Sequence, residues 1–229
     1  MTIFIRTGDS TVKRHTLPIV AATAALLLTA CGASEGGAGG SGNDASSTTA
    51  DDAQSRAPSP SASSADQNAP VFAPPSDVDT VVQRDPTGNA TKDAVLRDVA
   101  YSTQARLEAF AKGDGRTAHM NRYFAAQALT YWTQRVAKIW KDGLTVTDHY
   151  RFFDFAVTDV LNAKTATARY CEDQTTAYSK QIKTGKILRT KPSDNDFILI
   201  TLQAAKNSHG DWQVTQQNWK KGNAACVPG

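Results

Sequence analysis

The sequence has 229 residues, 40% of them hydrophobic, and a formal net charge of +3. Its basic residues are scattered, which does not favour a nucleic-acid partner. Its four histidines have no metal-ligand spacing, and it contains no glycine motif typical of phosphate binding. The sequence therefore predicts no metal, no cofactor and no nucleic-acid partner.

The first 30 residues have the order of a secretion signal. The basic residues Arg6, Lys13 and Arg14 precede an apolar run, and small residues follow it. The segment from Leu17 to Ala30 has only 14 residues, whereas a transmembrane helix needs about 20. An ordinary signal peptide cleaved at an alanine-rich site remains the alternative.

The signal ends in Leu28-Thr29-Ala30-Cys31, which resembles the lipobox of bacterial lipoproteins. In that family the cysteine is diacylated on sulfur and becomes the first residue of the mature protein. Two acyl chains hold a protein at a membrane where a single chain is marginal. The resemblance implies that residues 1–30 are a lipoprotein signal peptide and that Cys31 is lipidated. It places the protein at the outer face of the bacterial cell membrane.

Residues 31–85 are predicted to form a disordered linker. They are rich in Gly, Ser, Ala and Pro, with one aromatic residue, Phe72, and they carry eight acidic residues against two arginines. Such a segment cannot bury enough apolar surface to offset the entropy lost on ordering. The linker would let a folded domain stand away from the membrane.

Residues 86–229 are predicted to form one globular domain, with 20 basic residues against 13 acidic ones. A net charge of +7 would draw it towards anionic surfaces. A first helix is expected over 91–112, with Thr91 as N-cap and Gly113 as a left-handed stop. A second helix is expected over 123–142, because its apolar residues fall on one helical stripe.

After Gly143 the apolar residues alternate, which predicts strands rather than helices. In the first strand, Phe153, Phe155 and Val157 would share one face. The expected strands are 149–161, 164–172, 175–182, 187–190, 197–205 and 212–219. Helices followed by antiparallel strands predict an α+β fold, with two to three N-terminal helices packed on a strongly curved antiparallel sheet.

Cys171 and Cys226 remain once Cys31 is lipidated. Export would place them in an oxidising compartment, where an even pair is expected to form a disulfide. The bond would hold the polar C-terminal tail on the second strand. A redox-active pair is the alternative, but the sequence has no Cys-x-x-Cys spacing.

Several segments resemble secreted bacterial lipoproteins of the actinobacterial type. They are the run from Ala166 to Asp173, the Thr-Gly-Lys turn at 184–186, and Gly-Asp-Trp-Gln-Val at 210–214 before Cys226. The domains of that group are similar to the cone-shaped, SnoaL-like fold of nuclear transport factor two and ketosteroid isomerase. This resemblance implies a bent sheet wrapped by helices around a pocket. Members of the superfamily include both enzymes and binding modules, so fold alone does not fix function.

Two functions follow from such a pocket, and its candidate residues are Tyr101, Tyr123, Trp132 and Asp159. The first is a non-catalytic domain that binds a hydrophobic small ligand or an envelope protein. The second is a small isomerase- or hydrolase-type enzyme, with Asp159 or Asp154 as base and a tyrosine as donor. Alternation places Asp154 opposite the aromatic face, which disfavours it as a buried base. A two-domain solute-binding protein is less well supported, because the chain has one predicted domain.

Overall fold

The computed structural model describes residues 69–228. The predicted signal peptide, Cys31 and the linker up to residue 68 lie outside the described residues. Three helices, α1 (Ala90–Lys112), α2 (Ala118–Tyr123) and α3 (Ala126–Lys141), come before most of the strands. Both long helices lie where periodicity predicts them, and α2 is an additional short helix.

Capping residues determine where α1 begins and ends. Asn89, rather than the predicted Thr91, is the N-cap, because its side chain accepts hydrogen bonds from the backbone N–H groups of Thr91 and Lys92. Gly113 ends the helix in the left-handed region at φ 65°. The Trp140 ring lies against Gly113, so a side chain at this position would clash with it.

The strands form one sheet. They are β1 (Val78–Val82), β2 (Leu144–Leu161), β3 (Thr165–Asp173), β4 (Ala177–Gln181), β5 (Ile187–Leu188), β6 (Phe197–Lys206) and β7 (Trp212–Lys221). A 3₁₀ turn, η1 (Asp194–Asp196), leads into β6. The hydrogen-bonded order is β5-β4-β2-β3-β6-β7, and β1 also pairs with β2. The pairs are antiparallel except β1–β2.

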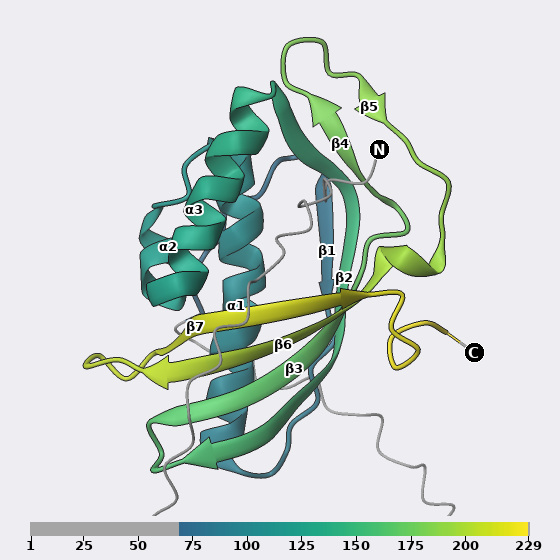
Figure 1. Cartoon of the computed structure of the whole chain (residues 1–229). Helices are drawn as coiled ribbons and strands as arrows, with labels where there is room; N and C mark the ends of the chain where they lie inside the picture. Colours follow the sequence, from purple (N-terminus) through teal and green to yellow (C-terminus); the bar gives the residue numbers. More distant parts are fainter. Residues whose placement is uncertain (1–68, 229) are drawn as a thin grey trace, which may run out of the picture. The chain divides into compact units, whose positions relative to one another are not determined.

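The described residues thus form three helices packed on one face of a strongly curved antiparallel sheet, which confirms the predicted α+β fold (Figure 1).

The predicted linker boundary at residue 85 needs correction. Strand β1 lies within 31–85, yet it pairs in parallel with β2 from Val78 opposite Asp148 to Val82 opposite Phe152. Its five residues, Val-Asp-Thr-Val-Val, do not alternate between apolar and polar, so they show no strand period. The stabilising partner is also about 70 residues away, which no local pattern can reveal. The folded domain therefore begins before β1.

Strand β2 bends sharply, and its bends explain an error in the predicted faces. Asp148 and Asp154 adopt positive φ values of 67° and 52°, and the register with β3 shifts between Phe153 and Ala156. A bulge of this kind reverses the side-chain alternation. Phe152 is therefore fully buried, whereas Phe153 lies under the Arg151 guanidinium. Only Phe155 and Val157 of the predicted face pack against the core.

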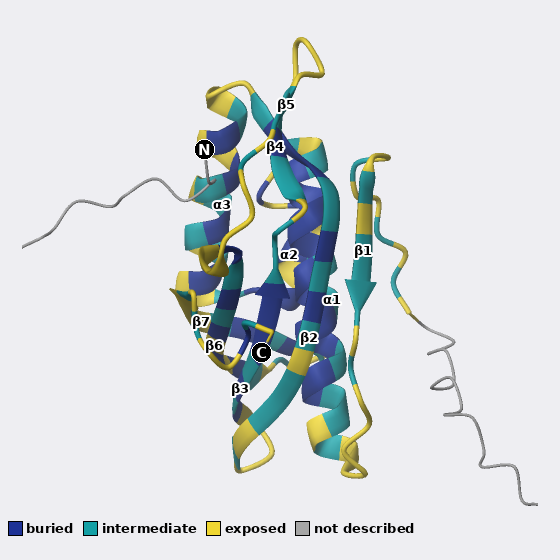
Figure 2. Ribbon diagram, turned by 90° about the vertical axis from the view of Figure 1, so that its right-hand side faces the viewer, coloured by how far each residue is buried: buried dark blue, intermediate teal, exposed yellow. Residues whose placement is uncertain are grey.

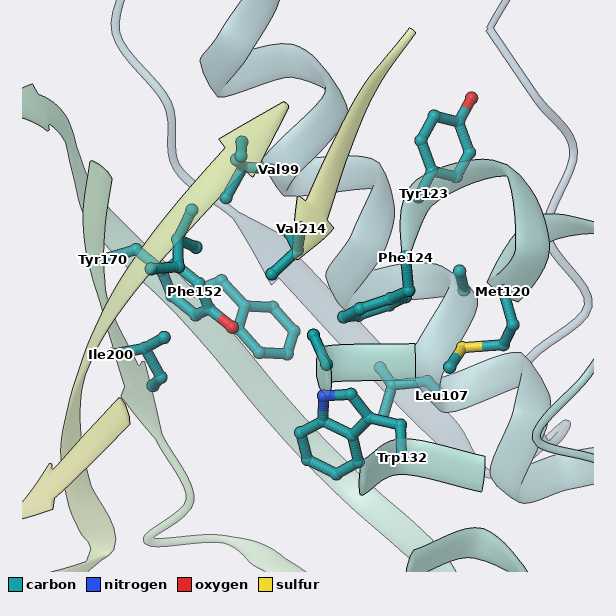
Figure 3. Close-up of a cluster of buried hydrophobic side chains, with 14 of the residues drawn as sticks. Val99, Leu107, Met120, Tyr123, Phe124, Trp132, Phe152, Tyr170, Ile200 and Val214 are labelled. Carbon is teal, nitrogen blue, oxygen red and sulfur yellow. The ribbon is translucent and has the colours of Figure 1, made fainter. Parts of the chain in front are cut away.

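The core lies between the helices and the concave face of the sheet. Figure 3 shows Phe152, Tyr170 and Ile200 of the sheet pointing towards Leu107 of α1 and Trp132 of α3. Exposed residues gather at the hairpin tips and loops (Figure 2). Burial of aromatic and branched side chains on both layers is the main source of stability.

The convex side of the sheet carries the disulfide between Cys171 of β3 and Cys226. Cys171 is fully buried although its neighbours Tyr170 and Glu172 face the core, because the C-terminal tail covers it. The Gly222 amide also donates to the Phe197 carbonyl. The predicted disulfide is present, and it fixes the polar tail to the sheet.

Candidate functional site

The concave interior contains a buried ion pair. Arg106 of α1 donates through Nη2 to Glu172 Oε2 of β3 at 2.7 Å, and the two side chains are only 7% and 2% exposed. Gln174 Nε2 donates to the other carboxylate oxygen at 2.5 Å. Both oxygens of Glu172 are therefore occupied, as a buried carboxylate requires.

Aromatic rings enclose this pair. The Arg106 guanidinium carbon lies 4.7 Å from the Trp132 ring centroid and 5.5 Å from that of Phe152, distances typical of cation–π contacts. Burial alone would lower the pKa of Arg106, but the Glu172 carboxylate raises it, so the guanidinium stays charged. Burial raises the pKa of Tyr150 and of Tyr170, so both phenols remain neutral.

Little space remains around these groups. The interior cavity measures about 30 Å³ and is lined by Arg106, Leu107, Phe110, Trp132, Arg135, Val146, Tyr150, Glu172 and Gln174. A water molecule needs about 10–15 Å³ of such space, so the cavity has room for no more than a few waters. Of the four predicted pocket residues, Trp132 lines this cavity. A small hydrophobic ligand has no room there in this conformation.

Tyr101 and Tyr123 lie elsewhere, in an aromatic cluster on α1 and α2. Their ring centroids are 5.5 Å apart, and Phe72 lies 4.6 Å from the His119 ring and 5.9 Å from Tyr101. The Tyr123 hydroxyl is buried without a hydrogen-bond partner among the described residues. Burial raises the pKa of Tyr123. Phe72, the aromatic residue of the predicted linker, thus joins the domain.

The predicted carboxylate bases are at the surface. Asp159 is exposed on β2, away from the residues that line the interior cavity. Asp154 is also exposed and accepts from Arg169 Nη1 at 2.7 Å. The carboxylate that lines the interior cavity is Glu172, and its pairing with Arg106 and Gln174 does not favour a role as a free base.

A second hollow lies on the outside of the sheet, beside β1, and we call it the β1 cleft. Its volume is about 790 Å³, within the range of ligand-binding clefts. It is lined by Ser76, Asp77, Val78, Asp79, Asp148, His149, Thr176, Tyr178 and Arg189. The parallel pairing of β1 with β2 brings the two Asp-rich segments together.

The β1 cleft contains charges of both signs. Arg189 Nη2 is 3.5 Å from Asp148 Oδ2, and the Arg189 side chain is 64% exposed. The same guanidinium carbon lies 5.5 Å from the Tyr178 ring centroid. Asp148 Oδ2 is buried and accepts no hydrogen bond from the described residues. The Asp148 side chain as a whole is 33% exposed, so the carboxylate still borders the cleft.

The other acids of the β1 cleft are already paired. Asp77 Oδ2 accepts from Thr147 and Lys180, each at 2.5 Å. Burial alone would raise the pKa of Asp77, but these two hydrogen bonds lower it. His149 Nδ1 lies 2.9 Å from Asp79 Oδ2 at the exposed rim. No group of three or more His, Cys, Asp or Glu side chains within residues 69–228 is arranged to hold a metal ion.

Sequence reasoning missed both charged sites. Glu172 could have been found, because it continues the alternation of Ala166, Ala168 and Tyr170 along β3. Its partner Arg106 lies 66 positions earlier in the chain, and no local signal joins the two. The β1 cleft depends on β1, which was assigned to the linker.

Within residues 69–228 no helix combines the length and the apolar character needed to cross a membrane.

No family model and no curated protein matches this sequence. Among solved structures, the intermembrane-space region of the chloroplast protein ARC6 is 14% identical, with a TM-score of 0.38, and the match covers 54% of this chain and 92% of that one. A ketosteroid isomerase-like protein from Erwinia carotovora atroseptica is 17% identical, with a TM-score of 0.33 and coverage of 58% and 97%. At these identities the function has to be inferred from the residues of this chain itself.

Proposed function

We propose that this chain is a lipid-anchored extracytoplasmic protein whose domain binds a polar segment of an envelope partner without catalysing a reaction. Two observations support the location. The segment Leu28-Thr29-Ala30-Cys31 resembles a lipobox at the end of a signal sequence. The domain also contains a disulfide between Cys171 and Cys226, a bond typical of oxidising compartments.

The binding proposal rests on the long ion pair between Arg189 and Asp148 in the β1 cleft. An exposed guanidinium and a buried carboxylate oxygen without a hydrogen bond lie 3.5 Å apart. A partner that presents an acceptor to the exposed Arg189 guanidinium and a donor to the exposed part of the Asp148 carboxylate would add charge-assisted hydrogen bonds to both. Since the interior cavity has only about 30 Å³, the β1 cleft supports a polar partner better than the interior supports a hydrophobic ligand.

The anchor is tested by mass spectrometry and fractionation of the native protein. We expect a mature polypeptide that begins at Cys31 and carries acyl groups. Cys31→Ser should move the protein from the membrane fraction to the soluble one. Ser41→Ala, a matched change in the same Gly- and Ser-rich stretch, should leave it at the membrane. A Cys31→Ser protein that stays in the membrane fraction would overturn the lipidation proposal.

Partner binding is tested by photo-crosslinking in cells. A photoreactive amino acid at position 178 should crosslink a defined envelope protein, and Arg189→Glu or Asp148→Asn should abolish that product. The same amino acid at Thr201, on the outer face of β6, is the matched control and should not give it. A product that survives both substitutions would show that the β1 cleft is not the binding surface.

A further inference from the structure

A third hollow lies between α3 and β7, and we call it the α3–β7 hollow. Its volume is about 220 Å³, and it is lined by Gln127, Ala128, Tyr131, Gln217, Asn218 and Trp219. It shares no residue with the β1 cleft or with the interior cavity. None of its side chains carries a charge.

Two aromatic rings form its apolar part. Trp219 is 39% exposed, and its ring centroid lies 4.9 Å from that of Tyr131 at an interplanar angle of 41°. Tyr131 packs edge-on against the buried Trp132 at 5.0 Å, so the core supports the pair from behind. The rings therefore form a fixed platform at the surface.

Secondary structure places amides beside these rings. Gln127 and Tyr131 are four residues apart on α3, and so share one face of the helix. Gln217 and Trp219 are two residues apart on β7, opposite the core residues Leu202 and Ile200. Both therefore lie on the face of the sheet that meets α3.

The amide side chains that face this hollow are not hydrogen-bonded to other residues of the domain. Gln127 and Gln217 line the hollow, and neither makes a side-chain hydrogen bond to the described residues. Asn218 also borders the hollow, but it pairs with Thr201, so its side chain points to the outer face of the sheet. Each amide offers both donors and an acceptor. A purely apolar ligand would desolvate these groups without pairing them, at a cost in affinity.

We propose that the α3–β7 hollow binds a neutral saccharide ring. A sugar ring presents C–H groups that pack on an aromatic platform, and hydroxyl groups that both donate to and accept from amides. The absence of charged side chains from the lining favours a neutral sugar over an acidic one. This site is independent of the anchor and of the β1 cleft.

The test is an NMR titration of the full-length Cys31→Ser protein with the neutral tetrasaccharides of glucose, mannose, galactose and N-acetylglucosamine. Trp219 is one of four tryptophans, and its indole N–H signal should shift and saturate with at least one of the sugars. The signal of the buried Trp212 should not move. If none of the four sugars shifts the Trp219 signal saturably, the proposal is overturned.

Variants locate the site. Gln217→Leu keeps both rings and removes one amide, so it should weaken binding about tenfold. Gln216→Leu is the matched control, because Gln216 is the next residue and does not line the α3–β7 hollow. It lines a neighbouring hollow that Gln217 and Asn218 also border. Equal losses in the two variants would overturn the site. Trp219→Ala should abolish binding, and Gln217→Leu decides the question if that variant does not fold.

A membrane contact is the competing role for an exposed tryptophan, and the same protein tests it. Phosphatidylcholine vesicles should not broaden the Trp219 signal. Broadening by vesicles together with no response to sugars would replace the saccharide proposal by a membrane one. Either outcome leaves the proposals for the anchor and for the β1 cleft standing.

Discussion

Among the arginine–carboxylate pairs of the domain, two lie in opposite surroundings. Arg106 and Glu172 meet at 2.7 Å with almost no exposed surface, whereas Arg189 and Asp148 stand 3.5 Å apart with the arginine largely in solvent. The first pair is completed by Gln174 and two aromatic rings. The second leaves a carboxylate oxygen without a hydrogen bond.

The difference shows how one kind of residue pair serves two purposes. Inside, the pair and its rings occupy space where a pocket would otherwise be, and the cost of burying the charges is offset by complete pairing. In the β1 cleft, Arg189 and Asp148 are not hydrogen-bonded to each other, and under the proposed function a partner would form hydrogen bonds with them. The interior pair should therefore matter for stability, and the cleft pair for binding.

The largest effect is expected from breaking the interior pair. Glu172→Leu leaves the Arg106 charge buried and should lower the free energy of unfolding by about 3–5 kcal/mol, measured by urea denaturation. The double variant Arg106→Met with Glu172→Leu should recover most of this loss. If Glu172→Leu alone has the same free energy of unfolding as the native protein, the pair does not stabilise the fold.

Loss of the disulfide, which lies buried under the C-terminal tail, should have an effect of nearly the same size. Cys171→Ser should reduce the free energy of unfolding by about 4 kcal/mol, because a loop of this length is no longer closed in the unfolded chain. The Cys226 thiol should then react with thiol reagents. Cys226→Ser should give the same loss, and the double variant should add nothing further.

Glu108 is a buried carboxylate whose partners Lys112 and His119 are partly exposed. Its carboxylate accepts a hydrogen bond from Lys112 Nζ at 2.5 Å, and its other oxygen lies 2.5 Å from His119 Nδ1. Burial alone would raise the pKa of Glu108, but these partners lower it below its ordinary value of 4.5. Glu108→Gln should cost about 1–3 kcal/mol at neutral pH.

The pH dependence of that loss has a defined sign. A lowered folded-state pKa stabilises the fold above the unfolded pKa, and this stabilisation disappears as the pH falls through the folded value. The difference between the native protein and Glu108→Gln should therefore shrink below about pH 4.5. A difference that stays constant in urea titrations down to acid pH would contradict this account.

The smallest effect on stability is expected in the β1 cleft. Arg189→Ala should change the free energy of unfolding by less than about 1 kcal/mol, because the arginine is solvent-exposed and its ion pair is long. The same variant should lose the crosslinked product obtained at position 178. A large destabilisation would assign this pair a structural role like that of Arg106 and Glu172.

The sequence predicted the helices and strands whose apolar residues recur at a regular spacing. Amphipathic periods located both long helices and the main strands after residue 143, because side-chain spacing alone determines those patterns. It did not reveal β1, which is short and stabilised by a distant partner, or the turn at Asp154, which changes the face of Phe153. Of the candidate site, Trp132 was found as a buried aromatic residue. The charges of Arg106 and Glu172 meet only in three dimensions.

The position of β1 determines how the domain carries mechanical load. Tension that arrives from the N-terminal side first meets Phe72 on the aromatic cluster of α1 and α2. It then reaches a strand whose pairing with β2 ends at Val82. Just before that strand, Asp77 accepts hydrogen bonds from Thr147 and Lys180. A force applied from the N-terminal side would therefore act first on one ring contact, these hydrogen bonds and one short ladder.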